Sequence, residues 1–412
     1  MRSTRPLFLS DALIVDGTGG TPFRGSLLVQ HGKIIACGAN LEAPADAVVI
    51  PMEGKGVSPG GVDLHTQVFA GPGIFSVEPA EIGLQSGVTT LIDAGSAGAL
   101  TFESFVRHGI RTAHERILAY VNVASAGLLH GHAAEPGYVG DHFHPGLHSI
   151  ALAESILKQY PSEIIGWKAR LTAVLAGNDP ILEKAALEAL IELRDRTQRP
   201  VMVHHIESSV PPAELLARLG RRDVFTHLYH GRAGSIFHLE TGEPLDAAWE
   251  ARERGVLFDV GHGCGSFRWE LAERACQKFG FWPDTISSDL HRYNLFWPVR
   301  DLATTLSKFL HLGASLEAVI AMATGNTLPA FAPGSAAASL LTPSAPADLT
   351  LFEVEEGTFP LADAEGVTRV TRRRILPLAV IRSGNLSPCY GFRSRPDLSD
   401  AFAISLQSAL SL

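Results

Sequence analysis

The feature that most constrains the fold is a repeated unit in which a short apolar run ends at a polar residue and a helical stretch follows. Eight such runs are rich in β-branched and aliphatic residues, which favour strands. They are Val57–Leu64, Val88–Asp93, Arg116–Val123, Ile164–Lys168, Pro200–His204, Val224–His227, Val256–Val260 and Thr285–Asp289. Because strands that alternate with helices form parallel sheets, eight units predict an α/β protein with a (β/α)8 TIM barrel.

Helical stretches lie between several of these runs and after the last one. Apolar residues recur at spacings of three and four in Thr101–His114, Ile181–Thr197, Pro212–Leu219 and Ala303–Met322. The alternative arrangement is a doubly wound open sheet, whose signature is a GxGxxG turn after the first strand. The sequence has no such turn there, and Gly95-Ser96-Ala97-Gly98 resembles it only weakly. The barrel is therefore the favoured fold.

The two ends of the chain have a different pattern. Residues 1–57 contain short apolar runs separated by Gly and Asp, which is typical of antiparallel hairpins. Late apolar runs such as ILPLAVIRSG also have no helix between them. We therefore predict a small β-sandwich domain from residues 1–57 and 336–395, the barrel in 58–335, and a short C-terminal tail in 396–412.

Composition restricts the partners of the protein. Charged residues are only 19% of the chain and its formal net charge is −9, whereas nucleic-acid binding requires clustered Lys and Arg. No apolar run reaches the roughly 18 residues that cross a bilayer. The four cysteines (Cys37, Cys264, Cys276, Cys389) are far apart and are expected to be free thiols in a reducing compartment. We expect a cytoplasmic protein with no nucleic-acid or membrane partner.

Metal-binding residue types stand at the ends of five predicted strands: His65, Lys168, His204, His227 and Asp289. The carboxyl ends of barrel strands meet on one face, so these residues are expected to lie together. Side chains alternate along a strand, which places Gln67 beside His65, Arg170 beside Lys168 and His291 beside Asp289. A divalent ion held by imidazoles and carboxylates lowers the pKa of bound water to about 7. The pattern favours a metal-dependent hydrolase with Asp289 as its acid and base.

A lysine among these residues needs its own explanation. An ammonium ion is a poor ligand, because it has no lone pair to donate. If carbon dioxide carboxylates the Lys168 amine, the product is an anion with two oxygens that can bridge two metals.

The order of these residues resembles the amidohydrolase superfamily. The segments DAGSAGA, THLYHG, FDVGHGCGSF, SSDLH and TTLSKFL look like its deacetylase or dihydroorotase-like branch, over about residues 10–390. The resemblance implies one or two divalent metals, with zinc the expected ion, and a carbamylated Lys168. The implied ligands are His65, Gln67, Lys168, His204, His227 and Asp289. The implied substrate-binding residues are Arg170, His262, Gly263 and His291.

One position departs from the family pattern. Gln67 stands where the family has a second histidine, and an amide oxygen binds zinc more weakly than an imidazole does. Three outcomes stay open. They are a binuclear site assisted by Gln67, a mononuclear site held by Lys168, His204 and His227, and a non-catalytic binding protein that has lost metal.

The expected reaction is hydrolysis of an amide or ester acyl bond, such as an acetyl group, on a small anionic molecule. The anionic substrate is suggested by Arg170 on the ligand face. The alternative is ring opening of a cyclic amide, as in a dihydroorotase or hydantoinase, which would use the same metal residues. A homo-oligomer is expected because barrels of this type present large apolar outer faces.

Overall fold

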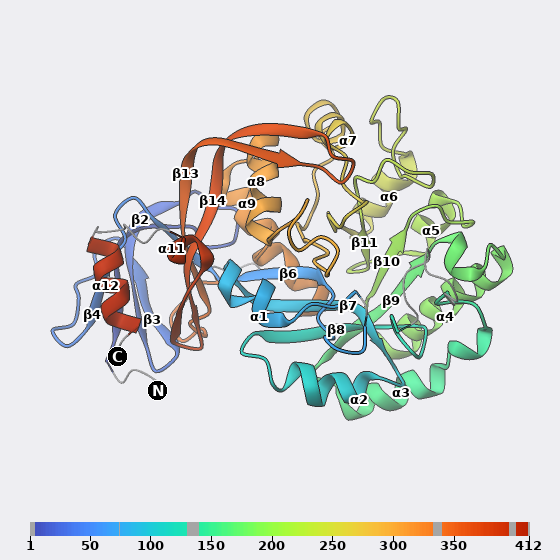
Figure 1. The fold of residues 1–412 in the computed structure, drawn as a ribbon, viewed down its shortest axis with the longest axis horizontal. Coiled ribbons are helices and arrows are strands. Elements are labelled where there is room, and N and C mark those ends of the chain that lie inside the picture. The colour runs from blue at the N-terminus through green and yellow to red at the C-terminus, as the bar shows by residue number, and fades with distance from the viewer. Residues whose placement is uncertain (1–4, 74, 130–139, 333–339, 395–400, 411–412) are drawn as a thin grey trace.

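Two sheets organise the protein (Figure 1). The computed structural model describes residues 5–73, 75–129, 140–332, 340–394 and 401–410. A parallel sheet of seven strands carries most of the helices, and a second, mostly antiparallel sheet of eight strands is built from both ends of the chain. The predicted α/β class is therefore confirmed, with the strands of the two ends in a sheet of their own.

The parallel sheet follows the order of the chain. Its strands are β6 (Gly61–Thr66), β7 (Val88–Gly98), β8 (Arg116–Asn122), β9 (Ile164–Leu171), β10 (Val201–His205), β11 (Val224–Thr226) and β12 (Leu257–Phe258). Each strand pairs in parallel with the next one along the chain. A doubly wound sheet would reverse this order part of the way across. The alternative arrangement is therefore wrong.

The eighth predicted strand, Thr285–Asp289, is not a regular strand. Its segment makes one parallel bridge to each edge of the sheet, Thr285 to Asp259 and Leu290 to Thr66. The backbone N–H of Asp289 also donates to the carbonyl of His65 at 2.8 Å. Asp289 has a φ of 48°, in the left-handed region, and this turn interrupts a regular ladder. The segment contacts both edges of the sheet without becoming a strand of it.

The first predicted strand, Val57–Leu64, is also corrected. It divides into β5 (Gly56–Pro59), which belongs to the sheet of the chain ends, and β6, which belongs to the parallel sheet. Gly60 separates them, and a Cβ there would lie 2.1 Å from the hydroxyl oxygen of Thr89. The chain passes between the sheets where only glycine fits.

The second sheet joins strands from both chain ends. Its strands are β1 (Leu7–Ile14), β2 (Phe23–Gln30), β3 (Lys33–Gly38), β4 (Val48–Pro51), β5, β13 (Leu349–Ala362), β14 (Thr368–Arg382) and β15 (Asn385–Pro388). They form one hydrogen-bonded sheet, because β5 pairs with both β1 and β13. The two layers of the predicted sandwich stay a prediction. The predicted boundaries at 335/336 and 395/396 lie outside the described residues.

The helices confirm part of the predicted pattern. They are α1 (Pro79–Ile82), α2 (Phe102–Phe105), α3 (Ile150–Gln159), α4 (Pro180–Thr197), α5 (Pro212–Arg218), α6 (Asp246–Glu253), α7 (Trp269–Glu273), α8 (Leu302–Leu312), α9 (Leu316–Met322), α10 (Leu328–Phe331), α11 (Tyr390–Arg393) and α12 (Ala401–Leu410). The predicted helices at 181–197 and 212–219 correspond to α4 and α5. The predicted helix at 303–322 is two helices, because the chain turns at Gly313 with a φ of 103°. Among the described helices, none has the length and apolarity to cross a bilayer.

Strand β9 illustrates how packing positions the site. Trp167, Ala169 and Leu171 belong to the large apolar core that includes the helices. Lys168 and Arg170 alternate with them and line a cavity on the opposite face. The apolar residues fix the strand, and the alternation presents the two basic side chains to the cavity.

Candidate active site

A cavity of about 490 Å³ opens at the carboxyl ends of the parallel strands. Eight of the ten predicted site residues line it: His65, Gln67, Lys168, Arg170, His204, His227, Asp289 and His291. They come from four strands or the residue directly after a strand, and from residues 289 and 291, up to 226 positions apart in the chain. Parallel strands have thus brought these residues to one place, as the spacing predicted.

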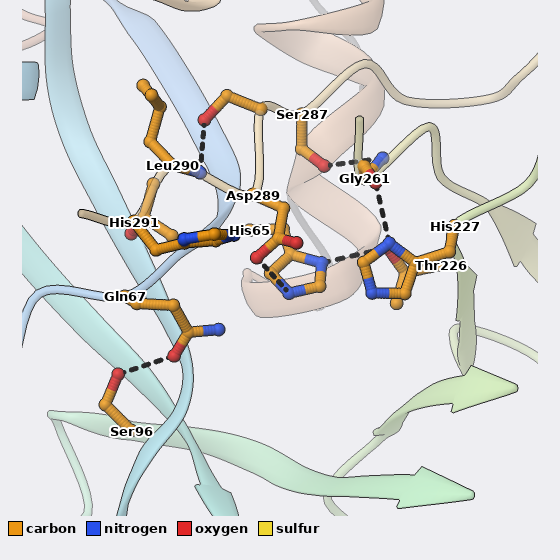
Figure 2. Close-up of polar contacts among 12 residues, drawn as sticks. His65, Gln67, Ser96, Thr226, His227, Gly261, Ser287, Asp289, Leu290 and His291 are labelled. Atoms are coloured by element: carbon orange, nitrogen blue, oxygen red, sulfur yellow. Dashed lines mark hydrogen bonds and ion pairs between the residues drawn. The ribbon is translucent and has the colours of Figure 1, made fainter. Parts of the chain in front are cut away.

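Three side chains form a group that could hold a metal ion. The ligand atoms of His65, His227 and Asp289 all lie within 4.8 Å of one another. Figure 2 shows the two rings and the carboxylate facing one another, with His65 Nε2 at 3.3 Å from Asp289 Oδ1. The ring of His204 lies edge-on to that of His227, with a centroid distance of 4.4 Å. Imidazole and carboxylate at this spacing suit a divalent transition metal.

Hydrogen bonds determine which ring nitrogen of each histidine faces this group. Thr226 Oγ1 donates to Asp259 Oδ2 at 2.7 Å, so it must accept from His65 Nδ1, at 2.9 Å. His227 Nδ1 lies 2.6 Å from the carbonyl oxygen of Gly261, which can only accept. Both Nε2 atoms therefore carry a lone pair. Such outer hydrogen bonds orient metal-binding histidines in general.

Burial keeps these histidines neutral. It lowers the pKa of His65, His204 and His227 well below the ordinary value, and the mutual proximity of the basic groups lowers it further. The His65–Asp289 contact thus joins a neutral ring to a carboxylate. A neutral imidazole is the form that binds a metal.

Lys168 is buried, and no described residue accepts a hydrogen bond from its amine. Its side chain is 1% exposed, and among the described residues its Nζ has no hydrogen-bond partner. Burial lowers the pKa of the amine, although the nearby Asp289 opposes this. Gly95 makes room for the side chain: it has a φ of 91°, and a Cβ there would lie 2.8 Å from Lys168 Cγ. An unpartnered buried amine costs free energy, so this atom fits a site that is completed by a bound group.

The backbone is strained at two residues of the site. His227 and Asp289 have φ values of 67° and 48°, which non-glycine residues rarely adopt. Burial raises the pKa of the Asp289 carboxyl, while Lys168 and a hydrogen bond from Gln67 lower it. Gly263 lies against this carboxylate, because a Cβ there would be 2.6 Å from Asp289 Oδ2. Strain held by the surrounding structure is typical of functional sites.

Two carboxylates outside the predicted site residues hold the segment that carries Asp289. Asp259 accepts hydrogen bonds from the hydroxyls of Thr226, Thr285 and Ser287, at 2.6–2.8 Å. Asp63 accepts from both the backbone N–H and the hydroxyl of Ser288. Hydroxyl residues are common in loops, so the residue pattern does not indicate these pairs.

The basic side chains of the cavity are partly neutralised. Arg170 makes two hydrogen bonds of 2.7 Å to the buried carboxylate of Asp141. Arg232, which was not predicted, also lines the cavity and lies 3.5 Å from Glu207, with both side chains about half exposed. Neither Asp141 nor Arg232 stands at a strand end, which is why the spacing did not reveal them. The cavity offers two guanidinium groups, of which that of Arg232 is the more accessible.

The predicted substrate contact of His262 is wrong. Its side chain is fully buried, and its ring stacks on Phe267. Nδ1 donates to the carbonyl of Gly263 at 2.8 Å, and Nε2 accepts from Lys308 Nζ at 2.5 Å. Because both nitrogens are engaged within the protein, His262 supports its loop. Gly263 itself packs on Asp289, and His291 lines the cavity.

Comparisons with known proteins agree with this geometry. A family model described as a deacetylase-like composite domain matches residues 341–386. A deacetylase of Brucella anthropi is 34% identical over 84% of this chain and 83% of its own length. A deacetylase of Agrobacterium fabrum is 34% identical over 89% of this chain and 88% of its own length.

Two solved structures are also similar to this chain over most of its length. A dihydroorotase structure matches with a TM-score of 0.82 and 30% identity, covering 93% of this chain and 98% of that one. An adenine deaminase structure matches with a TM-score of 0.82 and 28% identity, covering 93% of this chain and all of that one. The likeness spans both sheets.

Proposed function

This chain belongs to the amidohydrolase superfamily, and we propose that it hydrolyses an amide or ester acyl bond, such as an acetyl group, of a small anionic molecule. It is a metal-dependent hydrolase by that membership. The single observation that carries the proposal for this chain is the unpartnered Nζ of Lys168 beside His65, His227 and Asp289. A buried amine with no acceptor, next to neutral imidazoles, suits a carbamate that shares a metal with them.

We assign the metal residues as follows. His65, Lys168, His204, His227 and Asp289 would hold one or two divalent ions, with zinc the expected metal and Lys168 carbamylated by carbon dioxide. The bound metal would supply Lewis acidity toward the substrate carbonyl and toward water. Burial favours the neutral amine of Lys168, and only this form reacts with carbon dioxide.

Each side chain has a task in this scheme. Thr226 and the carbonyl of Gly261 hold His65 and His227 in the tautomers that present Nε2 to the site. Asp289 takes the proton of the attacking water and returns it to the leaving group, for which a raised pKa is useful near neutral pH. Gly263 lets the loop 261–265 pass close to this carboxylate.

We propose that residues 285–290 act as the eighth strand and close a (β/α)8 barrel, because they bridge to Asp259, directly after β12, and to Thr66 of β6. The barrel predicted at 58–335 would then begin at β6, and the β-domain predicted at 1–57 and 336–395 would include the whole of β5, which ends at Pro59. Residues 396–412 are proposed as a tail. A homo-oligomer and a cytoplasmic location remain proposals from the sequence.

An anionic substrate is supported by the two arginines of the cavity. Arg232 is half exposed and its ion pair with Glu207 is weak, since exposed pairs contribute only about 0–1 kcal/mol. We assign Arg232, with Arg170, to the substrate anion. The test is a panel of N-acyl amino acids and O-acetyl hydroxy acids against the zinc-loaded protein. Hydrolysis of at least one acidic member supports the proposal, and no hydrolysis by a zinc-containing protein contradicts it.

Ring opening of a cyclic amide is the second candidate. It is favoured by the likeness to the dihydroorotase structure, at 30% identity and a TM-score of 0.82. Hydantoins and dihydropyrimidines in the same panel separate the two reactions. The third reading, a non-catalytic binding protein, depends on Gln67 alone, and the deacetylase relatives support an enzyme.

A further inference from the structure

We infer that Thr172 is a positioning residue for the metal site: its hydroxyl oxygen accepts a hydrogen bond from His204 Nε2, so that His204 presents Nδ1 to the metal. The inference rests on the proposed function, in which His204 is a metal ligand. Thr172 lies outside the residues that the sequence singled out.

Thr172 and His204 meet at the wall of the cavity. Both residues line it, and Thr172 Oγ1 lies 3.2 Å from His204 Nε2. If the imidazole ring were turned by half a rotation, a carbon atom would face the hydroxyl and the hydrogen bond would be lost. The contact therefore favours the ring orientation in which Nε2 lies against Thr172 and Nδ1 is left for another partner.

The position of the ring proton decides which atom donates. A neutral imidazole has one N–H and one nitrogen with a lone pair. If Thr172 donated to Nε2, the proton would be on Nδ1, and His204 would have no lone pair left for a metal. A ligand role for His204 therefore requires the proton on Nε2, with Thr172 as the acceptor. His65 and His227 have the reverse arrangement, because the protein engages their Nδ1 atoms.

The backbone holds the hydroxyl in place. Thr172 directly follows β9 and keeps extended angles, with φ −150° and ψ 127°, so its side chain stays on the cavity face. One residue earlier, the carbonyl of Leu171 accepts from the N–H of Ile206 at 3.2 Å. One residue later, the N–H of Ala173 donates to the carbonyl of Glu207 at 3.0 Å. Because the side chain is also branched at Cβ, its rotation is restricted.

The turn that follows does not use this hydroxyl. Thr172 is the N-cap residue of a short 3₁₀ helix at Ala173–Ala176, a position where threonine usually accepts from a backbone N–H of the first turn. Within the described part of the chain, its side chain makes no such hydrogen bond. Capping does not account for a hydroxyl at this position, whereas the contact with His204 does.

The first test measures zinc affinity in the full-length protein. Thr172→Val removes the hydroxyl at nearly the same volume, and Thr172→Ser keeps it. We expect the Kd for zinc, measured by competition with a chelator, to rise about ten- to a hundredfold in Thr172→Val, the usual cost of losing a hydrogen bond to a metal-binding histidine. Thr172→Ser should stay within about threefold of the wild type, because its hydroxyl can still accept.

Thr197→Val is the matched control. The Thr197 hydroxyl also accepts from a ring nitrogen, Trp167 Nε1 at 2.8 Å, but on the side of β9 that faces the apolar core. This variant loses the same kind of hydrogen bond away from the site. It should lower the stability of the protein and keep the Kd for zinc.

The second test identifies the bound nitrogen in the wild type, so it does not depend on the folding of a variant. In a crystal structure of the zinc-loaded protein, we expect His204 Nδ1 at about 2.0–2.1 Å from the metal. His204 Nε2 should stay within hydrogen-bond distance of Thr172 Oγ1. His65 and His227 should bind through Nε2.

Zinc that is not bound to Nδ1 of His204 overturns the inference, and so does an unchanged Kd in Thr172→Val. It is also overturned if Thr172→Ser or Thr197→Val weakens zinc binding as much as Thr172→Val does, since the effect would not then come from the hydroxyl at His204. A wild-type protein that binds no zinc under saturating supply overturns the proposed function, and the inference with it. Zinc bound equally by the wild type and by Thr172→Val contradicts the inference alone.

Discussion

Two buried lysines of this protein have opposite surroundings. Lys168 and Lys308 are 1% and 0% exposed, and burial lowers the pKa of both amines. Lys308 Nζ contacts His262 Nε2 at 2.5 Å, the carbonyl of Ala362 at 2.6 Å and that of Pro298 at 3.3 Å. Lys168 Nζ has no hydrogen-bond partner among the described residues. The amine of Lys308 has its hydrogen-bond partners within the protein, whereas the amine of Lys168 needs a bound group to supply them.

The difference shows how to separate a structural lysine from a reactive one. Both stand near the site, because Lys308 supports the loop that carries Gly263 through His262. Only the lysine without acceptors has a reason to be modified. Removing each lysine should therefore affect different properties, and the following predictions test that contrast.

The largest expected effect is on the activity of Lys168→Met. We expect kcat/KM to fall by a factor of about 10³ or more, because the proposed carbamate of Lys168 is a metal ligand. The zinc content should fall with it. The stability of the metal-free protein should not decrease, since the substitution removes an unpartnered polar atom. Elemental analysis, a rate assay and urea unfolding with a chelator measure the three properties. A variant that keeps zinc and activity would make Lys168 another structural lysine.

The next effect is on the stability of Lys308→Met. We expect a loss of about 2–4 kcal/mol in the free energy of unfolding, because His262 Nε2 and two carbonyls lose their donor inside the protein. Zinc content should stay near that of the wild type. Urea unfolding of the metal-free proteins measures the loss. If stability is unchanged while zinc is lost, the assignment of the two lysines is reversed.

The pH dependence of stability sharpens the contrast. Burial lowers the pKa of Lys308 to about 7 in the folded protein, from about 10.5. Between these values the unfolded chain binds more protons, so this group makes the wild type more stable as pH rises. The stability gap between wild type and Lys308→Met should widen from pH 7 to pH 9, by at most about 1.4 kcal/mol per pH unit. Lys168 is present in both proteins and cancels. A gap that narrows with pH would contradict the pKa direction.

The smallest effect is that of bicarbonate. Metal-free protein reloaded with zinc should recover activity several-fold faster with bicarbonate than in buffer freed of carbon dioxide, because the neutral Lys168 amine must react with it. Lys308→Met should respond to bicarbonate as the wild type does. Equal recovery in both buffers would argue against carbamylation of Lys168.

The sequence predicted most of the site because parallel strands follow a simple rule. His65, Lys168, His204 and His227 end apolar runs. Parallel strands end at the same edge of a sheet and side chains alternate along each strand, so these four were expected to lie together. His262 was misplaced because it follows the turn at Gly261, where the φ of 48° changes the direction of the side chains. Loops do not keep the two-residue period, and for the same reason Asp141 and Arg232 were missed.

The fold was predicted with similar limits. The consecutive order β6 to β12 followed from the alternation of strands and helices. The division of the first strand at Gly60 did not, because it depends on a close approach to Thr89 from another strand. The single sheet of the chain ends depends likewise on pairing between residues about 290 positions apart. Periodicity predicts elements, whereas contacts over such distances decide how they join.

The most direct test of the account is a crystal structure of the protein loaded with zinc in bicarbonate. We predict electron density for a carboxyl group on Lys168 Nζ and for a metal ion bound by that group together with histidines and Asp289. A bare Lys168 amine, with no ion near His65, His227 and Asp289 at saturating zinc, would contradict it.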